Sequence, residues 1–185
     1  MKKFIVCLSA LFFAITSIET FAQTIPVNGK YGKVSTEEVE MQTYALDTSA
    51  VALVLYDKEF KSINLDASGV LRLTTEKQVR IKEEGTSYGD FKVVYYDGSI
   101  NAETVTGVEA TTYNMVDGKV VASKMSKKLI FDEPMTDDYY KKTWTAPEVK
   151  VGSVIECKWT ITDDAYWHVD EIYFLNSFSI YLAFL

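Results

Sequence analysis

Residues 71–81 read LRLTTEKQVRI, and the pattern of this stretch decides the expected class of fold. Apolar and polar residues alternate along it, which is the period of a β-strand with one face toward a core and the other toward solvent. One face comprises Leu71, Leu73, Thr75, Val79 and Ile81, with Lys77 as its exception. The opposite, polar face comprises Arg72, Thr74, Glu76, Gln78, Arg80 and Lys82. The stretch therefore predicts a half-buried strand.

Further strand signals lie on both sides of this stretch. Residues 51–56 form a nearly continuous apolar run, which is typical of a strand covered on both faces. Residues 103–116 and 119–125 flank Asp117-Gly118. This dipeptide favours a type I′ hairpin turn, because both central residues of such a turn need a positive φ. A further short strand is expected at residues 143–145, shortly before a proline.

The last clear alternation lies in residues 154–162. Its apolar face comprises Ile155, Cys157, Trp159 and Ile161, and its polar face comprises Glu156, Lys158, Thr160 and Thr162. Turn signals at a spacing of about 8–12 residues separate roughly eight to ten short strands along the chain. The sequence therefore predicts an all-β protein, an antiparallel β-sandwich over residues 34–175.

One short helix is expected, near the start of this region. The sequence STEE at residues 35–38 has the capping-box pattern. In that pattern Ser35 accepts from the backbone N–H of Glu38, and the Glu38 carboxylate accepts from the N–H of Ser35. We expect a helix of two or three turns that ends before Asp47. Residues 23–33 precede it and predict an extended lead-in, because they contain a proline and two glycines.

Residues 1–22 have the composition of a signal peptide. Two lysines precede an apolar run over residues 4–18, and Thr20 and Ala22 place small residues before a cleavage site at Gln23. The apolar run is shorter than the roughly 20 residues that a membrane span needs, so an uncleaved anchor is the alternative interpretation rather than the first. We therefore expect an exported protein, periplasmic or extracellular, with no membrane span after cleavage.

Composition and charge limit the partners. The chain of 185 residues is 48% hydrophobic and 24% charged, which excludes a disordered chain and is enough for a single folded core. Its formal net charge is −7, and removal of residues 1–22 would lower it by one further unit. Such a charge opposes binding to nucleic acid and to anionic lipid.

A cysteine enzyme is the sharpest catalytic alternative. Cys157 and His168 are the only cysteine and histidine outside residues 1–22. Cys157 lies in an alternating strand beside apolar residues, where a free cysteine usually behaves as a small hydrophobe. His168 lies within the acidic residues 163–171, which is typical of an exposed loop. We therefore expect no catalytic residue.

Metal and nucleotide sites lack their usual motifs. Asp137-Asp138 and residues 163–171 offer oxygen ligands for calcium, but neither matches the spacing of a calcium-binding loop. No zinc-ligand spacing, phosphate-binding loop or dinucleotide-binding glycine motif occurs after residue 22. We expect neither a metal nor a cofactor.

Aromatic residues next to acids are the candidate binding residues. Trp144 and Trp159 are expected in the core, because alternating aromatics in a sandwich mostly pack inside it. Tyr139, Tyr140 and Trp167 lie beside acids in expected loops. These three residues are the candidates for a platform that contacts a sugar ring or a peptide.

The order of several segments resembles one known family. The segments are residues 32–35 (GKVS), 47–50 (DTSA), 54–57 (VLYD), 79–82 (VRIK), 112–114 (TYN), 117–119 (DGK) and 146–156 (APEVKVGSVIE). Together they resemble the N-terminal β-sandwich domain of unknown function that precedes a transglutaminase-like core in exported bacterial proteins. The resemblance covers roughly residues 32–175, and GSVIE is its most specific part. Cys157 stands where that family usually has an aromatic residue.

This resemblance implies a non-catalytic accessory module that presents or gates polypeptide or cell-envelope material to a catalytic core. The catalytic residues of that core would lie outside this chain. Two alternatives remain, a stand-alone β-sandwich that binds glycan or peptide and a small cysteine-dependent enzyme. Residues 176–185 are apolar and lack a closing turn, so we expect them to be a strand cut short, as in a product truncated before the core.

Overall fold

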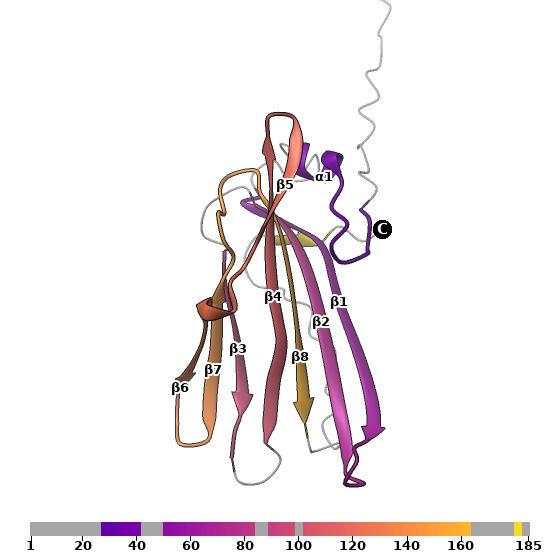
Figure 1. The fold of residues 1–185 in the computed structure, drawn as a ribbon, viewed down its shortest axis with the longest axis vertical. Helices are drawn as coiled ribbons and strands as arrows, with labels where there is room; N and C mark the ends of the chain where they lie inside the picture. The colour runs from indigo at the N-terminus through magenta and orange to yellow at the C-terminus, as the bar shows by residue number, and fades with distance from the viewer. Residues whose placement is uncertain (1–26, 42–49, 84–88, 99–101, 164–179, 183–185) are drawn as a thin grey trace, which may run out of the picture.

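Two β-sheets make up most of the described structure. The computed structural model describes residues 27–41, 50–83, 89–98, 102–163 and 180–182. The larger sheet has the strand order β5 (Lys119–Lys124), β4 (Glu103–Val116), β8 (Val154–Asp163), β2 (Leu71–Glu83), β1 (Ala52–Leu65) and β9 (Ile180–Leu182). The smaller sheet has the order β3 (Asp90–Tyr96), β7 (Tyr139–Thr145) and β6 (Ile130–Pro134). The predicted sandwich-like all-β fold is confirmed (Figure 1), and among the described strand pairs all are antiparallel except β1 with β9, which is parallel.

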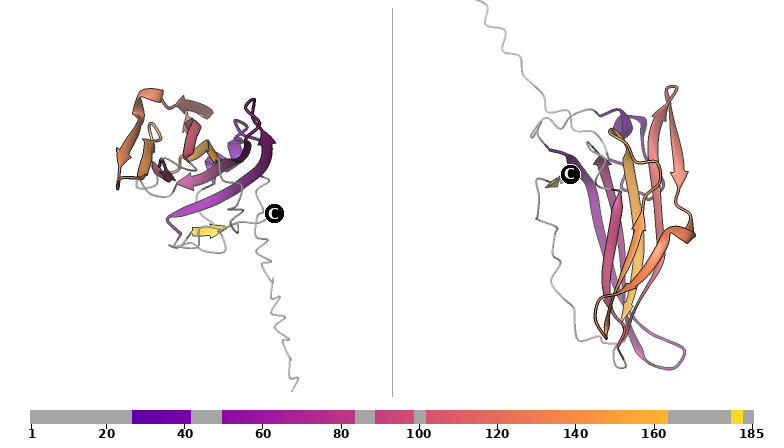
Figure 2. Two further views of the ribbon diagram at one scale, coloured as in Figure 1. Left: turned by 90° about the horizontal axis from the view of Figure 1, so that it is seen from below. Right: turned by 90° about the vertical axis from the view of Figure 1, so that its left-hand side faces the viewer.

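The core of the sandwich lies between the two sheets. Figure 2 shows the smaller sheet set against one side of the larger one. From the smaller sheet, Trp144 stacks on Phe91 with ring centroids 5.9 Å apart, and it meets Trp159 of β8 at 5.5 Å. Cys157 is buried in the same cluster. The predicted core positions of Trp144 and Cys157 are confirmed, and Trp159 is partly buried against them.

The opposite face of the larger sheet has its own apolar cluster. Val154 precedes Ile155 in β8, and because neighbouring strand residues point to opposite faces, the two belong to different clusters. Val154 packs with Leu53, Leu55 and Tyr113, and with residues of the N-terminal segment (residues 27–41). This segment therefore covers part of the sheet face that the smaller sheet leaves open.

The helix α1 (Thr36–Glu40) lies within the N-terminal segment and has the predicted capping box. The Ser35 hydroxyl accepts from the backbone N–H of Glu38 at 3.2 Å, and the Glu38 carboxylate accepts from the N–H of Ser35 at 2.6 Å. The predicted length was wrong, because the helix ends at Glu40, where Met41 is already extended with ψ 121°. A helix this short depends on its cap and on the packing of Val39 against the sheet. None of the helices in the described ranges is long and apolar enough to cross a membrane.

The turn at Asp117-Gly118 connects β4 to β5 as predicted. Asp117 has φ 49° and Gly118 has φ 73°, which are the left-handed values of a type I′ turn. Two differences concern the smaller sheet. β7 begins at Tyr139 rather than at Thr143, and β6 was not predicted. Both strands form because β7 pairs with β3 on one side and with β6 on the other.

Candidate functional site

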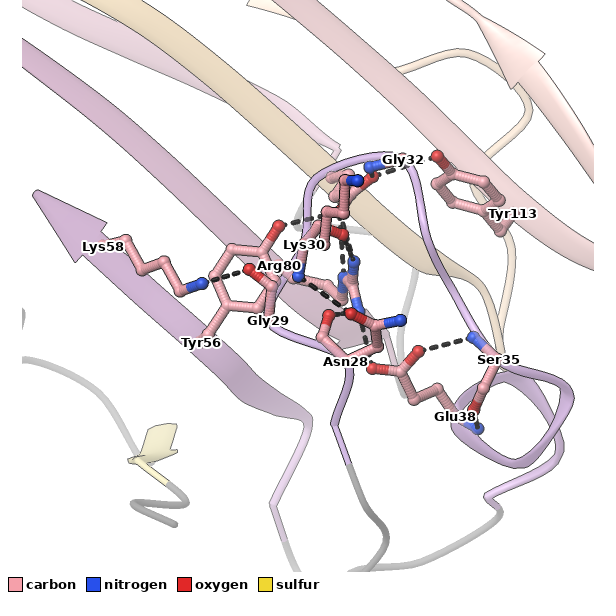
Figure 3. Close-up of polar contacts among 11 residues, drawn as sticks. Asn28, Gly29, Lys30, Gly32, Ser35, Glu38, Tyr56, Lys58, Arg80 and Tyr113 are labelled. Carbon is pink, nitrogen blue, oxygen red and sulfur yellow. Dashed lines mark hydrogen bonds and ion pairs between the residues drawn. The ribbon is translucent and has the colours of Figure 1, made fainter.

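Arg80 of β2 is the centre of a buried charge cluster, which we define as Glu38, Arg80, Lys82 and Glu156. Its guanidinium donates to Glu156 Oε1 from Nη2 at 2.5 Å and from Nε at 3.1 Å, and to Glu38 Oε1 from Nη1 at 2.7 Å. The two remaining N–H groups reach the backbone carbonyls of Asn28 at 2.9 Å and Lys30 at 3.0 Å (Figure 3). All five donors of the arginine are therefore satisfied without solvent.

The environment keeps Arg80 charged. Burial alone would lower the pKa of Arg80, but the hydrogen bond and the negative charge of Glu156 more than offset that effect, so the pKa lies above its usual value. The guanidinium also lies over the ring of Tyr56, with its central carbon 4.7 Å from the ring centroid. Arg80 thus acts as a permanent cation in the interior.

Glu156 of β8 faces Arg80 across the strand pair and accepts from four groups. Oε1 accepts from Arg80 and from the Tyr56 hydroxyl at 2.7 Å, and Oε2 accepts from the Tyr113 hydroxyl at 3.0 Å and from the backbone N–H of Gly32 at 2.8 Å. Burial and then the neighbouring Glu156 carboxylate raise the pKa of both tyrosines above the usual range. Both hydroxyls therefore stay protonated and donate to the carboxylate.

Lys82 completes the cluster. Its ammonium donates to the carbonyls of Val39 at 2.6 Å and Gly152 at 2.5 Å. The four side chains of the cluster are fully buried and comprise two cations and two anions, so their formal charges cancel. Most of their backbone partners belong to the N-terminal segment. The cluster can therefore fasten that segment to the sheet.

The burial of Arg80, Lys82 and Glu156 corrects the sequence analysis, which placed all three on solvent-facing strand faces. Their alternation was right, but the N-terminal segment covers this end of the face and supplies carbonyl and amide partners. Farther along the same face of β2, Glu76 is exposed as predicted. The local pattern held no signal for this difference, because the covering segment is distant along the chain.

Two of the predicted ligand residues do not form one platform. Tyr139 and Tyr140 are neighbours in β7 and therefore point to opposite faces of the smaller sheet. Tyr139 is 48% exposed, and its ring lies edge to face with that of Tyr96, with the ring centroids 5.3 Å apart. Tyr140 is half-buried, and its ring stacks on that of Tyr95, with the ring centroids 5.9 Å apart. Their predicted loop position was wrong, since both lie in a strand. Their binding role stays a prediction.

Other sequence predictions fall outside the described residues. Trp167 and His168 lie there, as do residues 1–22 and most of the acidic residues 163–171. Asp137 and Asp138 are described and exposed. Within the described ranges, no group of three or more histidine, cysteine, aspartate or glutamate side chains is arranged to hold a metal ion.

Comparison with known proteins places the chain in a family. The family described as a domain of unknown function with a solved structure, DUF3857, matches residues 67–180. The chain belongs to this family. The match includes Arg80, Lys82 and Glu156 of the charge cluster, while Glu38 and the rest of the N-terminal segment precede it.

Among solved structures, the DUF3857 chain is similar to a candidate protease from Parabacteroides distasonis ATCC 8503, with 16% sequence identity and a TM-score of 0.43. The similarity covers 61% of this chain and 23% of that structure, so the chain spans less than a quarter of that protein's length. No curated protein matches the chain.

Cys157 lies deep in this DUF3857 structure. Its strand pairs place it between Val79 of β2 and Ala110 of β4, and it is fully buried. Burial raises the pKa of its thiol to about 12, because a thiolate is poorly solvated there. This environment holds the thiol in its protonated form, whereas a cysteine nucleophile needs a thiolate that a substrate can reach.

A small groove of about 170 Å³ opens beside a bulge in β4 of the DUF3857 structure. Gly107, with φ 63°, lies at the bulge, and the groove continues to Ile130 of β6 and Lys142 of β7. The Lys142 ammonium is paired with Asp132 at 2.8 Å. Pockets for small-molecule ligands usually measure about 300–1,000 Å³, so this groove fits at most a small group or one side chain.

Proposed function

We propose that the chain is a non-catalytic, exported accessory module that presents or gates polypeptide or cell-envelope material to a transglutaminase-like core. The burial of its reactive side chains supports the non-catalytic role, because Cys157 and the charge cluster are fully buried. The signal-peptide pattern of residues 1–22 supports export. The resemblance to domains that precede transglutaminase-like cores supports the accessory role.

Cys157 is expected to resist iodoacetamide in the folded protein. Burial excludes the reagent, and a thiol pKa of about 12 leaves very little thiolate at neutral pH. Mass spectrometry after brief treatment should find Cys157 unmodified, and modified when the reagent is added in urea. The variant Lys92→Cys places a thiol on an exposed position of β3 and should react under native conditions. Rapid native modification of Cys157 would contradict a non-catalytic role.

Two experiments test the link to a transglutaminase-like core: sequencing of the adjoining DNA and a binding assay with the purified core. Sequencing of the adjoining DNA should find a reading frame for such a core, and the purified core should be retained on the immobilised chain. Absence of such a frame in the adjoining DNA, or a core that passes through unretained, would count against the link. For export, a phosphatase reporter that is active only outside the cytoplasm should gain activity when fused behind residues 1–22.

One observation favours a second candidate, a glycan-binding or peptide-binding sandwich. Tyr139 and Tyr96 form an edge-to-face pair on the outer face of the smaller sheet, and an exposed aromatic face can stack on a sugar ring. A glycan array should then show a ligand whose binding is lost in Tyr139→Ala and kept in Tyr140→Phe. An array without any saturable ligand would reject glycan binding.

A further inference from the structure

Residues 27–33 of the N-terminal segment, which we call the strap, lie across the end of the sheet face that carries the charge cluster (Figure 3). Among the described residues, no hydrogen bond joins the main chain of the strap to the main chain of either sheet. The strap has one main-chain bond of its own, from the N–H of Lys33 to the carbonyl of Lys30 at 3.2 Å. Side chains of the sheet therefore hold the strap in place, and its departure would break no strand pair.

Three successive carbonyls of the strap accept hydrogen bonds from cationic side chains of the sheet. Arg80 donates to the carbonyls of Asn28 at 2.9 Å and Lys30 at 3.0 Å. Lys58 of β1 donates to the carbonyl between them, that of Gly29. Every residue of a polypeptide has such a carbonyl, so these contacts recognise a main chain rather than particular side chains.

One main-chain N–H of the strap is recognised in the same way, by an anion. The N–H of Gly32 donates to Oε2 of Glu156 at 2.8 Å. The sheet face thus presents cations to carbonyls and a carboxylate to an N–H, in the order in which the strap offers them. This order selects a polypeptide main chain as the occupant of the face.

Four positions of the strap accept other side chains. Asn28, Lys30 and Lys33 are exposed. A Cβ at Gly29 would lie 2.7 Å from Nζ of Lys58, but that atom is the end of a flexible side chain and can move. Other residues at these four positions would therefore keep the main-chain contacts of the strap.

The remaining three positions of the strap are selective. Val27 packs against the apolar cluster on this face of the sheet. Nζ of Lys158 lies 4.8 Å from the centroid of the Tyr31 ring. Gly32 has φ 77°, a conformation that residues with a side chain rarely adopt. A fitting occupant therefore has an apolar residue first, an aromatic residue four positions later and a glycine directly after it.

We propose that this face of the larger sheet binds polypeptide segments with that pattern, and that the strap is a built-in occupant which such a segment displaces. α1 stays in place during the exchange, because the Glu38 carboxylate contacts Arg80 and Val39 packs on the sheet independently of the strap. Exchange of straps between two copies of this chain would only re-form the same contacts, whereas a longer partner polypeptide adds contacts beyond the strap.

This inference rests on the proposed role in presenting polypeptide, and it names the surface that would do so. Its test contains no transglutaminase-like core. A failed test would therefore remove this surface and leave the link to a core open, whereas a core that passes through unretained would leave the exchange of the strap untouched.

Fluorescence anisotropy of a labelled peptide, VSASYGS, tests the proposal on the full chain. The peptide keeps the three selective residues of the strap and replaces the other four. The tethered strap competes with it at an effective concentration of about 1 mM. The variant Gly32→Val should bind the peptide about tenfold more tightly than the parent, because valine disfavours the positive φ of the bound strap. A Cβ at Gly32 would meet no atom within 4 Å, so the sheet itself is unchanged. The peptide VSASYVS should bind about tenfold more weakly than VSASYGS.

Two further substitutions, made in the Gly32→Val chain, test the main-chain contacts. Lys58→Met removes the donor to the middle carbonyl and should weaken binding of VSASYGS about tenfold. Lys58 is exposed, so its replacement leaves the buried charge cluster intact. The matched control Lys92→Met changes an exposed lysine on β3 and should leave binding unchanged. Equal binding by these two variants would contradict recognition of the main chain.

Amide hydrogen exchange in the parent chain is a second measurement, which stays valid if Gly32→Val fails to fold. The peptide VSASYGS at millimolar concentration should speed exchange at Gly32, whose N–H loses Glu156, while Glu38 in α1 stays protected. Unchanged exchange at Gly32, or equal binding of VSASYGS and VSASYVS, would overturn the proposal. A dimer of the Gly32→Val chain in sedimentation would also overturn it, in favour of strap exchange between two copies.

Discussion

Arg80→Ala is expected to lower the free energy of unfolding by about 3–5 kcal/mol, because it leaves Glu38 and Glu156 buried without their cation. Carbonyls of the N-terminal segment lose their donors in the same step. Arg80→Lys should restore little of this loss, since an ammonium has three donors where the guanidinium has five. Urea denaturation followed by circular dichroism measures the change.

Arg72→Ala is the matched control for this experiment. Arg72 lies on the same strand and on the same face, but its side chain is 30% exposed and its ion pair with Asp66 at 2.9 Å is near the surface. Partly exposed pairs usually contribute about 0–1 kcal/mol, so the control should stay within that range. Equal losses for Arg72→Ala and Arg80→Ala would contradict a special role of the buried cluster.

Trp144→Ala should have a comparable effect by a different mechanism. Trp144 is 2% exposed and contacts Phe91 and Trp159 at the centre of the sandwich. Its removal leaves a cavity that the two sheets cannot close, and such substitutions cost about 3–5 kcal/mol. Tyr139→Ala, on the outer face of the same strand, should change the free energy of unfolding by about 0.5 kcal/mol or less. Loss of similar stability in both variants would show that the smaller sheet is not packed as described.

The parts of the fold that depend on local patterns could be predicted from the sequence. Leu73 and Val79 are buried as their alternation in β2 indicated, and Asp117-Gly118 forms the expected turn. The turn forms wherever two successive residues can adopt a positive φ. The alternation predicts the buried residues of β2 whenever one face of the strand is covered by other parts of the protein. Neither depends on which distant segment provides the cover.

The candidate site could not be predicted in this way. Arg80 and Glu156 meet through the register between β2 and β8, and the segment that buries them is far from both in sequence. Tyr139 was placed in a loop because acids precede it, whereas pairing with β3 and β6 makes it part of a strand. In each case a long-range contact overrides a local preference, which a single sequence does not show.

The charge cluster crosses the boundary of the matched family region, and this matters for anyone who excises the domain. A polypeptide trimmed to residues 67–180 would keep Arg80, Lys82 and Glu156 and discard Glu38, β1 and the carbonyls of Asn28 and Lys30. Arg80, Lys82 and Glu156, which are buried in the full chain, would then be exposed to water on a sheet that lacks β1 and the N-terminal segment. The autonomous folding unit has to start upstream of Asn28, well before the point at which sequence similarity begins.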